Sequence, residues 1–257
     1  MERVGSIGRT FFAIGIAVFG IQHLVYGNFV TRVVPTWPAW IPGRAWWAYA
    51  VGAALIAAGG AMLLRVRTRA VALVLGSALL LSVVALYLPM WLPDLRNGRL
   101  WTMMFKTIAL AGGAFAIARV ARKPANRRGS DDTLLWAGRL GFGSFLILAG
   151  IQHVIYVNFV ATLVPAWIPG GAVFWTIVAA VALMAGGVGI IVPRTSRLAA
   201  LCTGGMILTW FFVLHLPRAV AELGYGSNEM TALFEALAMS GIAFVLAGAA
   251  AHKPVVR

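Results

Sequence analysis

Six polar side chains stand inside otherwise apolar segments of this 257-residue chain, and they are the groups that could carry chemistry. Imidazole and carboxylate groups could bind a divalent metal, relay protons or hydrogen-bond a quinone carbonyl. Ionisable groups within apolar spans are costly and face a bundle interior, a cavity or a partner, so each is a candidate functional group. They form two sets, one of His23, Tyr87 and Lys106 and the other of His153, His215 and Glu235.

The two sets correspond to each other because the chain is one unit written twice. The segment Ile21–Val30 returns as Ile151–Val160 with seven of its ten residues identical. Positions kept in both copies report the common scaffold, and positions that differ mark where the two halves take separate roles. The kept polar positions are Gln22 and His23 with Gln152 and His153, and the changed ones are Tyr87 against His215 and Lys106 against Glu235.

Each repeated histidine has a tyrosine three residues later, Tyr26 after His23 and Tyr156 after His153. Residues three apart share a helix face, so the spacing is consistent with a tyrosine-lined polar pocket. The plainer interpretation of the Gln-His pairs is a helix-packing hydrogen bond to the loop that follows. The sequence leaves the polar pocket and the packing hydrogen bond as alternatives.

Lys106 and Glu235 also have a plainer interpretation, an ion pair that fixes how the two halves dock. It stands level with separate functional roles, because a pair shares the desolvation cost better than two lone charges. A metal site built from His153, His215 and Glu235 is disfavoured, since it needs a close ligand geometry that sequence does not supply. A haem held by the two histidines is disfavoured too, because the first copy has Tyr87 in place of the second histidine.

The composition is that of a polytopic membrane protein. The chain is 61% hydrophobic and 11% charged, and its uncharged runs are long enough for one or two bilayer spans each. The net charge of +14 lies in short segments between these runs, as membrane topology requires, so nucleic-acid binding is excluded. The single cysteine, Cys202, excludes an intramolecular disulfide.

The apolar runs predict four helices in each copy and eight in all. The first helix of each copy is expected over about Arg9–Tyr26 and Arg139–Tyr156. The third helix of each copy is expected to end at a Leu-Pro step, because proline cannot continue a regular helix. Those ends are Leu86–Pro89 and Leu214–Pro217, and the Pro/Trp-rich connectors Val34–Gly43 and Val164–Gly170 are expected to be interfacial loops or short re-entrant segments.

Counting basic residues orients the chain. Of the 21 Lys and Arg residues, 15 fall on the side that holds both termini and 6 on the other, so both termini are predicted to be cytoplasmic. An even number of helices per copy predicts two parallel four-helix repeats, related by a pseudo-two-fold axis along the membrane normal. The predicted repeats are residues 1–122 and 133–257, joined by a cytoplasmic linker at 123–132. Whether they pack as two separate bundles or exchange helices stays open.

These residues resemble the DoxX family, four-helix bacterial membrane proteins that are here duplicated. The resemblance implies a four-helix bundle per copy and an association with membrane redox chemistry, since relatives include small subunits of thiosulfate:quinone oxidoreductase and proteins of oxidant-defence complexes. Other relatives are assembly factors or cargo receptors. The motifs that carry the resemblance are Gly20–His23 with Val34-Pro35 and Trp40–Gly43, Gly150–His153 with Val164–Gly170, the two Leu-Pro steps, and the Gly-rich fourth helix.

We therefore expect a DoxX-like protein of the bacterial inner membrane, with a polar site near the periplasmic face. Its expected role is an accessory or quinone- or lipid-interacting subunit of a membrane redox system; as an isolated chain it is not expected to be an enzyme. The sequence does not identify a cofactor, and a quinone is the candidate. The bilayer is the expected partner, a quinone and other redox-complex subunits are candidate partners, and oligomerisation stays open. The alternatives are a small-solute or ion transporter and a structural assembly factor.

Overall fold

A computed structural model describes residues 2–32, 34, 37–38, 40–122, 129–222 and 228–249 of the chain. Every regular element in those ranges is a helix. Within the same ranges, eight helices are long and apolar enough to cross a bilayer, which confirms the predicted all-α membrane architecture at this level.

The first helix of each copy begins earlier than predicted, at Glu2 and at Gly129. Residues 129–132 of the predicted linker are therefore the first turn of a helix, while residues 123–128 lie outside the described ranges. The first copy comprises α1 (Glu2–Tyr26), α2 (Arg44–Leu63), α3 (Thr68–Ser82), the π-helical turn η1 (Val83–Tyr87), α4 (Leu88–Trp91) and α5 (Gly98–Val120). The second comprises α6 (Gly129–Ile155), α7 (Val157–Ala161), α8 (Ala172–Ile191), α9 (Ser196–Trp210), the π-helical turn η3 (Phe211–His215), α10 (Leu216–Ala221) and α11 (Asn228–Ala249).

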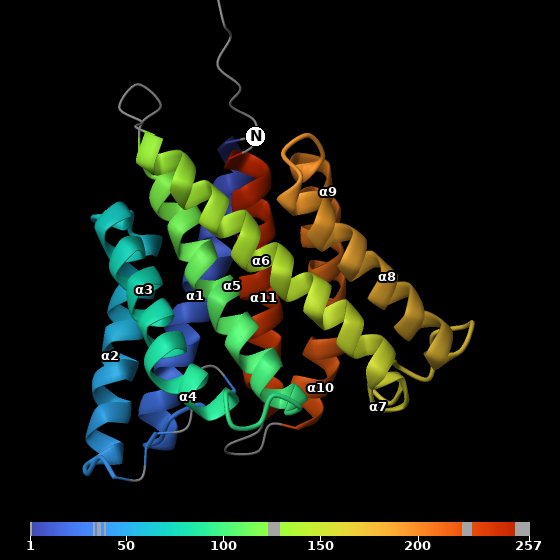
Figure 1. The fold of residues 1–257 in the computed structure, drawn as a ribbon, viewed down its shortest axis with the longest axis horizontal. Coiled ribbons are helices and arrows are strands. Elements are labelled where there is room, and N and C mark those ends of the chain that lie inside the picture. Colours follow the sequence, from blue (N-terminus) through green and yellow to red (C-terminus); the bar gives the residue numbers. More distant parts are fainter. Residues whose placement is uncertain are drawn as a thin grey trace, which may run out of the picture.

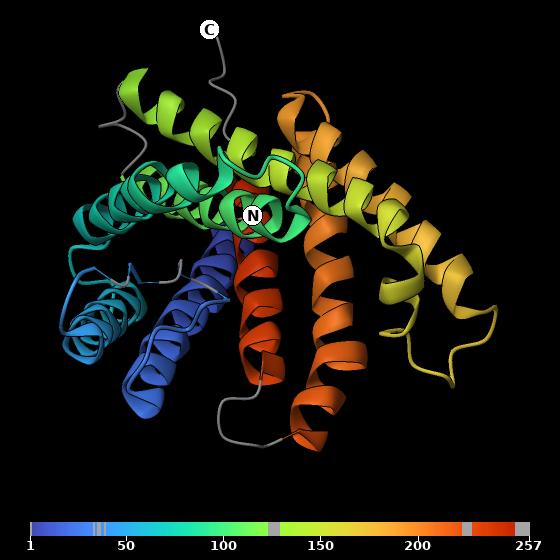
Figure 2. The ribbon, with the colours of Figure 1, turned by 60° about the horizontal axis from the view of Figure 1, so that its bottom comes forward.

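The long helices pack in chain order, and the two copies exchange neighbours. The first helix of each copy packs on the second helix of its own copy and on the fourth helix of the other: α1 lies against α2 and α11, and α6 lies against α8 and α5. Figures 1 and 2 show α1, α5, α6 and α11 together in the middle of the molecule, with α2 and α3 on one flank and α8 and α9 on the other. The halves therefore form one continuous bundle joined by the pairs α1–α11 and α5–α6, and not two separate four-helix bundles.

Glycines allow the helices of different copies to approach closely. A Cβ atom on Gly8 of α1 would lie 2.5 Å from the Gly241 carbonyl oxygen of α11. In the same way, a Cβ atom on Gly138 of α6 would lie 2.9 Å from the Gly112 carbonyl oxygen of α5. Small residues at such crossings let two backbones touch, which is a main source of helix association inside a membrane. The pairs α1–α11 and α5–α6 are thus joined by equivalent glycine contacts.

The third helix of each copy does not end at its Leu-Pro step, so that prediction is wrong. Before Pro89, the helix widens into η1, in which the Leu88 N–H donates to the Val83 carbonyl five residues back. A proline lacks an N–H and its ring clashes with the carbonyl four residues earlier, and a π turn relieves both problems without ending the helix. An equivalent turn precedes Pro217. The two turns end at Tyr87 and His215.

The Pro/Trp connectors are irregular where the structure describes them. In the second connector, Val164–Gly170 forms turns and Trp167 is 71% exposed. In the first, Trp40 is 82% exposed, and residues 33, 35, 36 and 39 lie outside the described ranges. Exposed tryptophans beside the ends of apolar helices are typical of the membrane–water interface.

Candidate functional site

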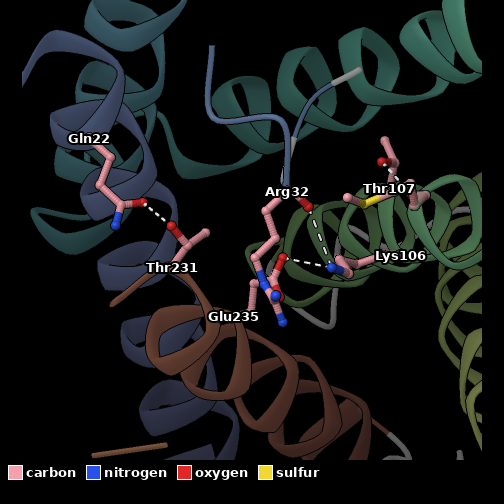
Figure 3. A network of polar contacts seen from close by, with 7 residues as sticks. Gln22, Arg32, Lys106, Thr107, Thr231 and Glu235 are labelled. Carbon is pink, nitrogen blue, oxygen red and sulfur yellow. Dashed lines mark hydrogen bonds and ion pairs between the residues drawn. The ribbon is translucent and has the colours of Figure 1, made fainter. Parts of the chain in front are cut away.

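Glu235 of α11 binds two cations from the first copy (Figure 3). Its Oε1 lies 2.8 Å from the Lys106 Nζ atom of α5, and its Oε2 lies 2.8 Å from the Arg32 Nε atom in the segment after α1. Lys106 also donates to the Arg32 carbonyl oxygen at 3.4 Å. Of the two interpretations that the sequence left level, the structure shows the ion pair between Lys106 and Glu235. The pair is not a lone one, because Arg32 joins it; we call these three residues the charge triad.

The charge triad is buried but is not electrically balanced. Lys106 and Glu235 are 7% and 6% exposed, whereas the side chain of Arg32 is 36% exposed. Two cations share one carboxylate, so one positive charge is left over. Removing charges from water is expensive, and an uncompensated charge is more expensive than a paired one. The excess positive charge is accessible at Arg32, because the other two side chains are buried.

The triad lies toward one end of the bundle. Lys106 and Glu235 lie in the first halves of α5 and α11, and these helices begin at the end where Figure 1 shows α4 and α10, opposite the N-terminus of α1. This is the end that the basic-residue count assigns to the periplasm. The predicted polar layer at a single end therefore has a structural counterpart.

Gln22 and Gln152 join helices of different copies. The Thr231 hydroxyl of α11 donates to Gln22 Oε1 at 3.1 Å (Figure 3), and the Thr102 hydroxyl of α5 donates to Gln152 Oε1 at 2.7 Å. Gln152 Nε2 also donates to the Gly98 carbonyl at 2.8 Å. The helix-packing interpretation of the glutamines is thus confirmed, although their partner is a threonine of the opposite copy and not the following loop.

The repeated histidines also act in the scaffold. His23 is fully buried, its Nδ1 lies 2.7 Å from the Phe19 carbonyl, and its Nε2 accepts from the Val30 N–H at 3.4 Å. His153 Nδ1 makes the equivalent 2.7 Å contact with the Ala149 carbonyl. Donation from Nδ1 to a carbonyl leaves Nε2 as an acceptor, so His23 ties the end of α1 to the segment that leads to Arg32.

The second-copy set of candidates does not converge on one point. His153 lies on α6, which packs on α5 and α8, whereas His215 lies at the end of η3, which packs on α11. Glu235 is engaged by Lys106 and Arg32. Within the described ranges there is no group of three His, Cys, Asp or Glu residues placed to hold a metal ion.

Two polar groups with unsatisfied hydrogen-bonding capacity flank the charge triad. Tyr87, 2% exposed, has a buried hydroxyl that lies near Thr107 but makes no hydrogen bond of ordinary geometry within the described part of the chain. His215 has a buried Nδ1 without a hydrogen-bond partner among the described residues, and its charged neighbours are Arg32, Glu229, Glu235 and Arg218. Buried polar atoms normally find partners, so unsatisfied ones beside an excess charge indicate a place for a polar ligand group.

We call the charge triad together with Tyr87 and His215 the polar cluster. The two tyrosines that follow the repeated histidines lie outside it. Tyr26 is partly buried and packs against the hydrophobic core, while Tyr156 is 45% exposed. Neither is brought to the charge triad by the contacts of the described residues.

Sequence reasoning missed Arg32 of the polar cluster and the neighbouring Thr102 and Thr231. The two threonines could have been found from their spacing. Thr102 and Thr231 stand four residues before Lys106 and Glu235, so each shares a helix face with its charged neighbour. Arg32 could be found only by asking which charges have no counterpart in the other copy, since Thr162 takes its place there.

A groove of about 300 Å³ lies between α3, α5, α6 and α8. It meets α5 at Ile108, Gly112 and Phe115, on the face opposite Lys106. It contains none of the predicted site residues and is lined by apolar side chains apart from Ser144. Its lining residues are Leu80, Ile108, Gly112, Phe115, Ala137, Leu140, Gly141, Ser144 and Ile191.

The fold and the charge triad define the class of protein, an α-helical membrane protein with a largely buried charge triad between its two halves. One family profile, described as a domain of unknown function (DUF8561), matches residues 142–238. The matched segment runs from α6 into α11 and includes Glu235. No curated protein and no solved structure matches the chain.

Proposed function

We propose that this chain is a DoxX-like accessory protein of the bacterial inner membrane, whose polar cluster holds the head of a quinone- or lipid-like ligand near the periplasmic face. The observation that carries the proposal is the composition of the cluster. Lys106 and Arg32 share one carboxylate, and the unsatisfied Tyr87 hydroxyl and His215 Nδ1 flank them. Such groups suit a ligand head that carries carbonyl or anionic oxygens.

The architecture that we propose for this function is two parallel repeats related by a pseudo-two-fold axis along the membrane normal, with both termini cytoplasmic. Three observations support it. The equivalent residues Lys106 and Glu235 meet each other, the equivalent pairs Gln22–Thr231 and Gln152–Thr102 both form, and equivalent helices have equivalent neighbours.

The side chains that follow Lys106 along α5 and Glu235 along α11 favour ligand binding over transport. Between Thr107 and Arg119 the buried side chains of α5 are apolar, as at Leu110, Ala114 and Ile117. Beyond Ser240, α11 is apolar in the same way, as at Ile242 and Leu246. A path for a hydrophilic solute or an ion needs polar or charged groups to replace its water. The cluster therefore resembles a site that is entered from one side of the membrane.

A structural assembly factor is the second candidate, and the tight junction between the halves favours it. Lys106 and Glu235 are almost completely buried, and Gln–Thr hydrogen bonds flank them across both inter-copy helix pairs. In that role the triad would fix the docking of the halves and would need no ligand. The association with a redox system rests on the family resemblance alone.

Detection of a bound ligand distinguishes the ligand-binding role from the assembly role. The full-length protein is purified in mild detergent, its organic extract is analysed by mass spectrometry, and a ubiquinone analogue is titrated while the absorption difference spectrum is recorded. The proposal expects a co-purifying quinone or lipid at near-stoichiometric amount or a saturable spectral change, either of them weakened in Tyr87→Phe. Tyr156→Phe, which changes an exposed tyrosine, is the control. An extract without such a molecule together with a flat titration would leave the assembly role.

A further inference from the structure

We infer that Arg32 and His215 form an anion-recognition site, which selects a ligand head bearing a phosphate or carboxylate group. The inference rests on the proposed ligand-binding function and narrows it from polar heads in general to anionic ones. It also places the site at one particular side of the charge triad.

The charges around Arg32 leave an opening for an anion. Two carboxylates lie near it, Glu235 and Glu229. Glu229 is held by Arg218 through two hydrogen bonds, at 2.9 and 2.8 Å, and Glu235 is shared between Lys106 and Arg32. Arg99 lies near Lys106, and Glu222 lies near Arg218. Counting these seven side chains, four cations face three anions. A further anion would bring the cluster to neutrality, which favours binding in surroundings of low dielectric constant.

The guanidinium of Arg32 has the geometry for this role. It uses Nε to bind Glu235, and within the described part of the chain no hydrogen bond to another residue involves its two terminal nitrogens. Those nitrogens form the end of a planar fork that matches two oxygens of a phosphate or carboxylate. The side chain is 36% exposed, whereas that of Lys106 is 9% exposed, so the excess charge is accessible at Arg32 and not at Lys106.

His215 supplies the second group. Its buried Nδ1 lacks a partner among the described residues, and Arg32 is among its charged neighbours. An imidazole with its proton on Nδ1 would donate to an anion that already contacts the guanidinium. The π turn η3 ends at His215, so the backbone distortion caused by Pro217 determines where this ring is placed.

The site is expected once in each chain, because the repeat is broken at both of its residues. The first-copy Tyr87 stands where the second copy has His215, and the second-copy Thr162 stands where the first copy has Arg32. The equivalent location beside Lys106 therefore has neither the guanidinium nor the imidazole. One chain should bind one anionic head.

An experiment with two arms tests the inference and separates two sources of the anion. The full-length protein is placed in nanodiscs of phosphatidylcholine with a minor fraction of phosphatidylglycerol, and the lipid that remains bound after detergent extraction is measured by native mass spectrometry. In the second arm, inorganic phosphate is titrated against protein in pure phosphatidylcholine nanodiscs, with thermal stability as the readout. Arg32→Gln and His215→Phe are the test variants, and Arg96→Gln, an exposed arginine at the same end of the bundle, is the control.

In Arg32→Gln we expect the affinity for phosphatidylglycerol, measured as the amount of lipid retained, or the affinity for phosphate, measured by thermal stability, to fall on the order of tenfold. The reason is that a charge-assisted hydrogen-bonding group is lost. A smaller loss is expected in His215→Phe and none in Arg96→Gln. A change in the first arm identifies a lipid head, and a change in the second identifies a free anion. Arg32→Lys keeps a cation beside Glu235 but removes the fork, so it reports on recognition even if Arg32→Gln folds poorly.

The inference is overturned if Arg32→Gln and Arg32→Lys match Arg96→Gln in both arms. A neutral quinone or neutral lipid that stays bound in the same variants would show that the proposed function holds while anion selection does not. If the wild-type protein binds no quinone, lipid or anion in these measurements, the proposed function itself is contradicted.

Discussion

Lys106 and Glu235 occupy the same position in the two sequence copies, and they meet each other at 2.8 Å between α5 and α11. Equivalent residues of two repeats come into contact only where the repeats face each other. A symmetric pair of lysines or of glutamates there would repel, so the difference between the copies allows the halves to pack tightly. Arg32 then breaks the balance a second time, because it adds a cation on one side only.

Glu235→Gln should destabilise the protein more than Lys106→Met does. The first change leaves two cations without a buried counter-charge and should cost roughly 3–5 kcal/mol. The second leaves Glu235 with Arg32, so its cost should be clearly smaller. Unfolding by increasing amounts of sodium dodecyl sulfate in mixed micelles, followed by circular dichroism, measures both.

The charge-swapped variant Lys106→Glu/Glu235→Lys provides the control for this interpretation. It restores a pair between α5 and α11, but Arg32 then faces a lysine. We therefore expect only partial recovery of stability. Full recovery would mean that Arg32 contributes nothing to the charge triad.

The helices could be predicted from the sequence, because the apolar runs are long. Lys106 and Glu235 lie at equivalent places inside these runs, which made an ion pair one of the two interpretations that the sequence left open. The packing of the first helix of each copy on the fourth helix of the other could not be predicted, because apolar runs do not specify which helices are neighbours. Continuation of the helix past Pro89 depends on a π turn supported by neighbouring helices. Arg32 lies in an irregular segment, for which periodicity gives no direction.

Gln152→Ala should cost more stability than Gln22→Ala, although the two glutamines are equivalent in sequence. Gln152 makes two hydrogen bonds, to Thr102 and to the Gly98 carbonyl, whereas Gln22 makes one, to Thr231, and its Nε2 is buried without a partner within the described ranges. Each interhelical hydrogen bond in a membrane contributes about 0.6 kcal/mol, so the first change should cost about twice the second. A double-mutant cycle with Thr102→Val, measured by the same unfolding method, should give a coupling near that value. Additive effects would contradict the contact.

Two adjacent glycines of α2 should respond oppositely to alanine. A Cβ atom on Gly59 would lie 2.7 Å from the Ala13 carbonyl oxygen and 2.8 Å from Ala17, whereas one on Gly60 would meet nothing within 4 Å. We expect Gly59→Ala to cost about 1–3 kcal/mol through overpacking against α1. Gly60→Ala should be neutral or should stabilise by up to about 1 kcal/mol, because alanine favours the helix. Equal effects in thermal unfolding would contradict the packing of α1 on α2.

At the opposite end of the bundle, Asp131→Asn should be more damaging than Asp132→Asn. Asp131, completely buried at the start of α6, lies 2.7 Å from Arg69 of α3 and 3.3 Å from Arg122 beyond α5, so it joins the second copy to the first. Its loss would leave two partly exposed guanidinium groups without their counter-charge and would remove two ion pairs from a buried side chain, one of them a charge-assisted hydrogen bond, which should cost about 2 kcal/mol. The Asp132 side chain is 73% exposed and lies 3.8 Å from Arg119, a contact of a kind that contributes at most about 1 kcal/mol. Unfolding curves of the two variants in the same detergent measure the difference. Similar midpoints would show that this buried cluster does not hold the halves together.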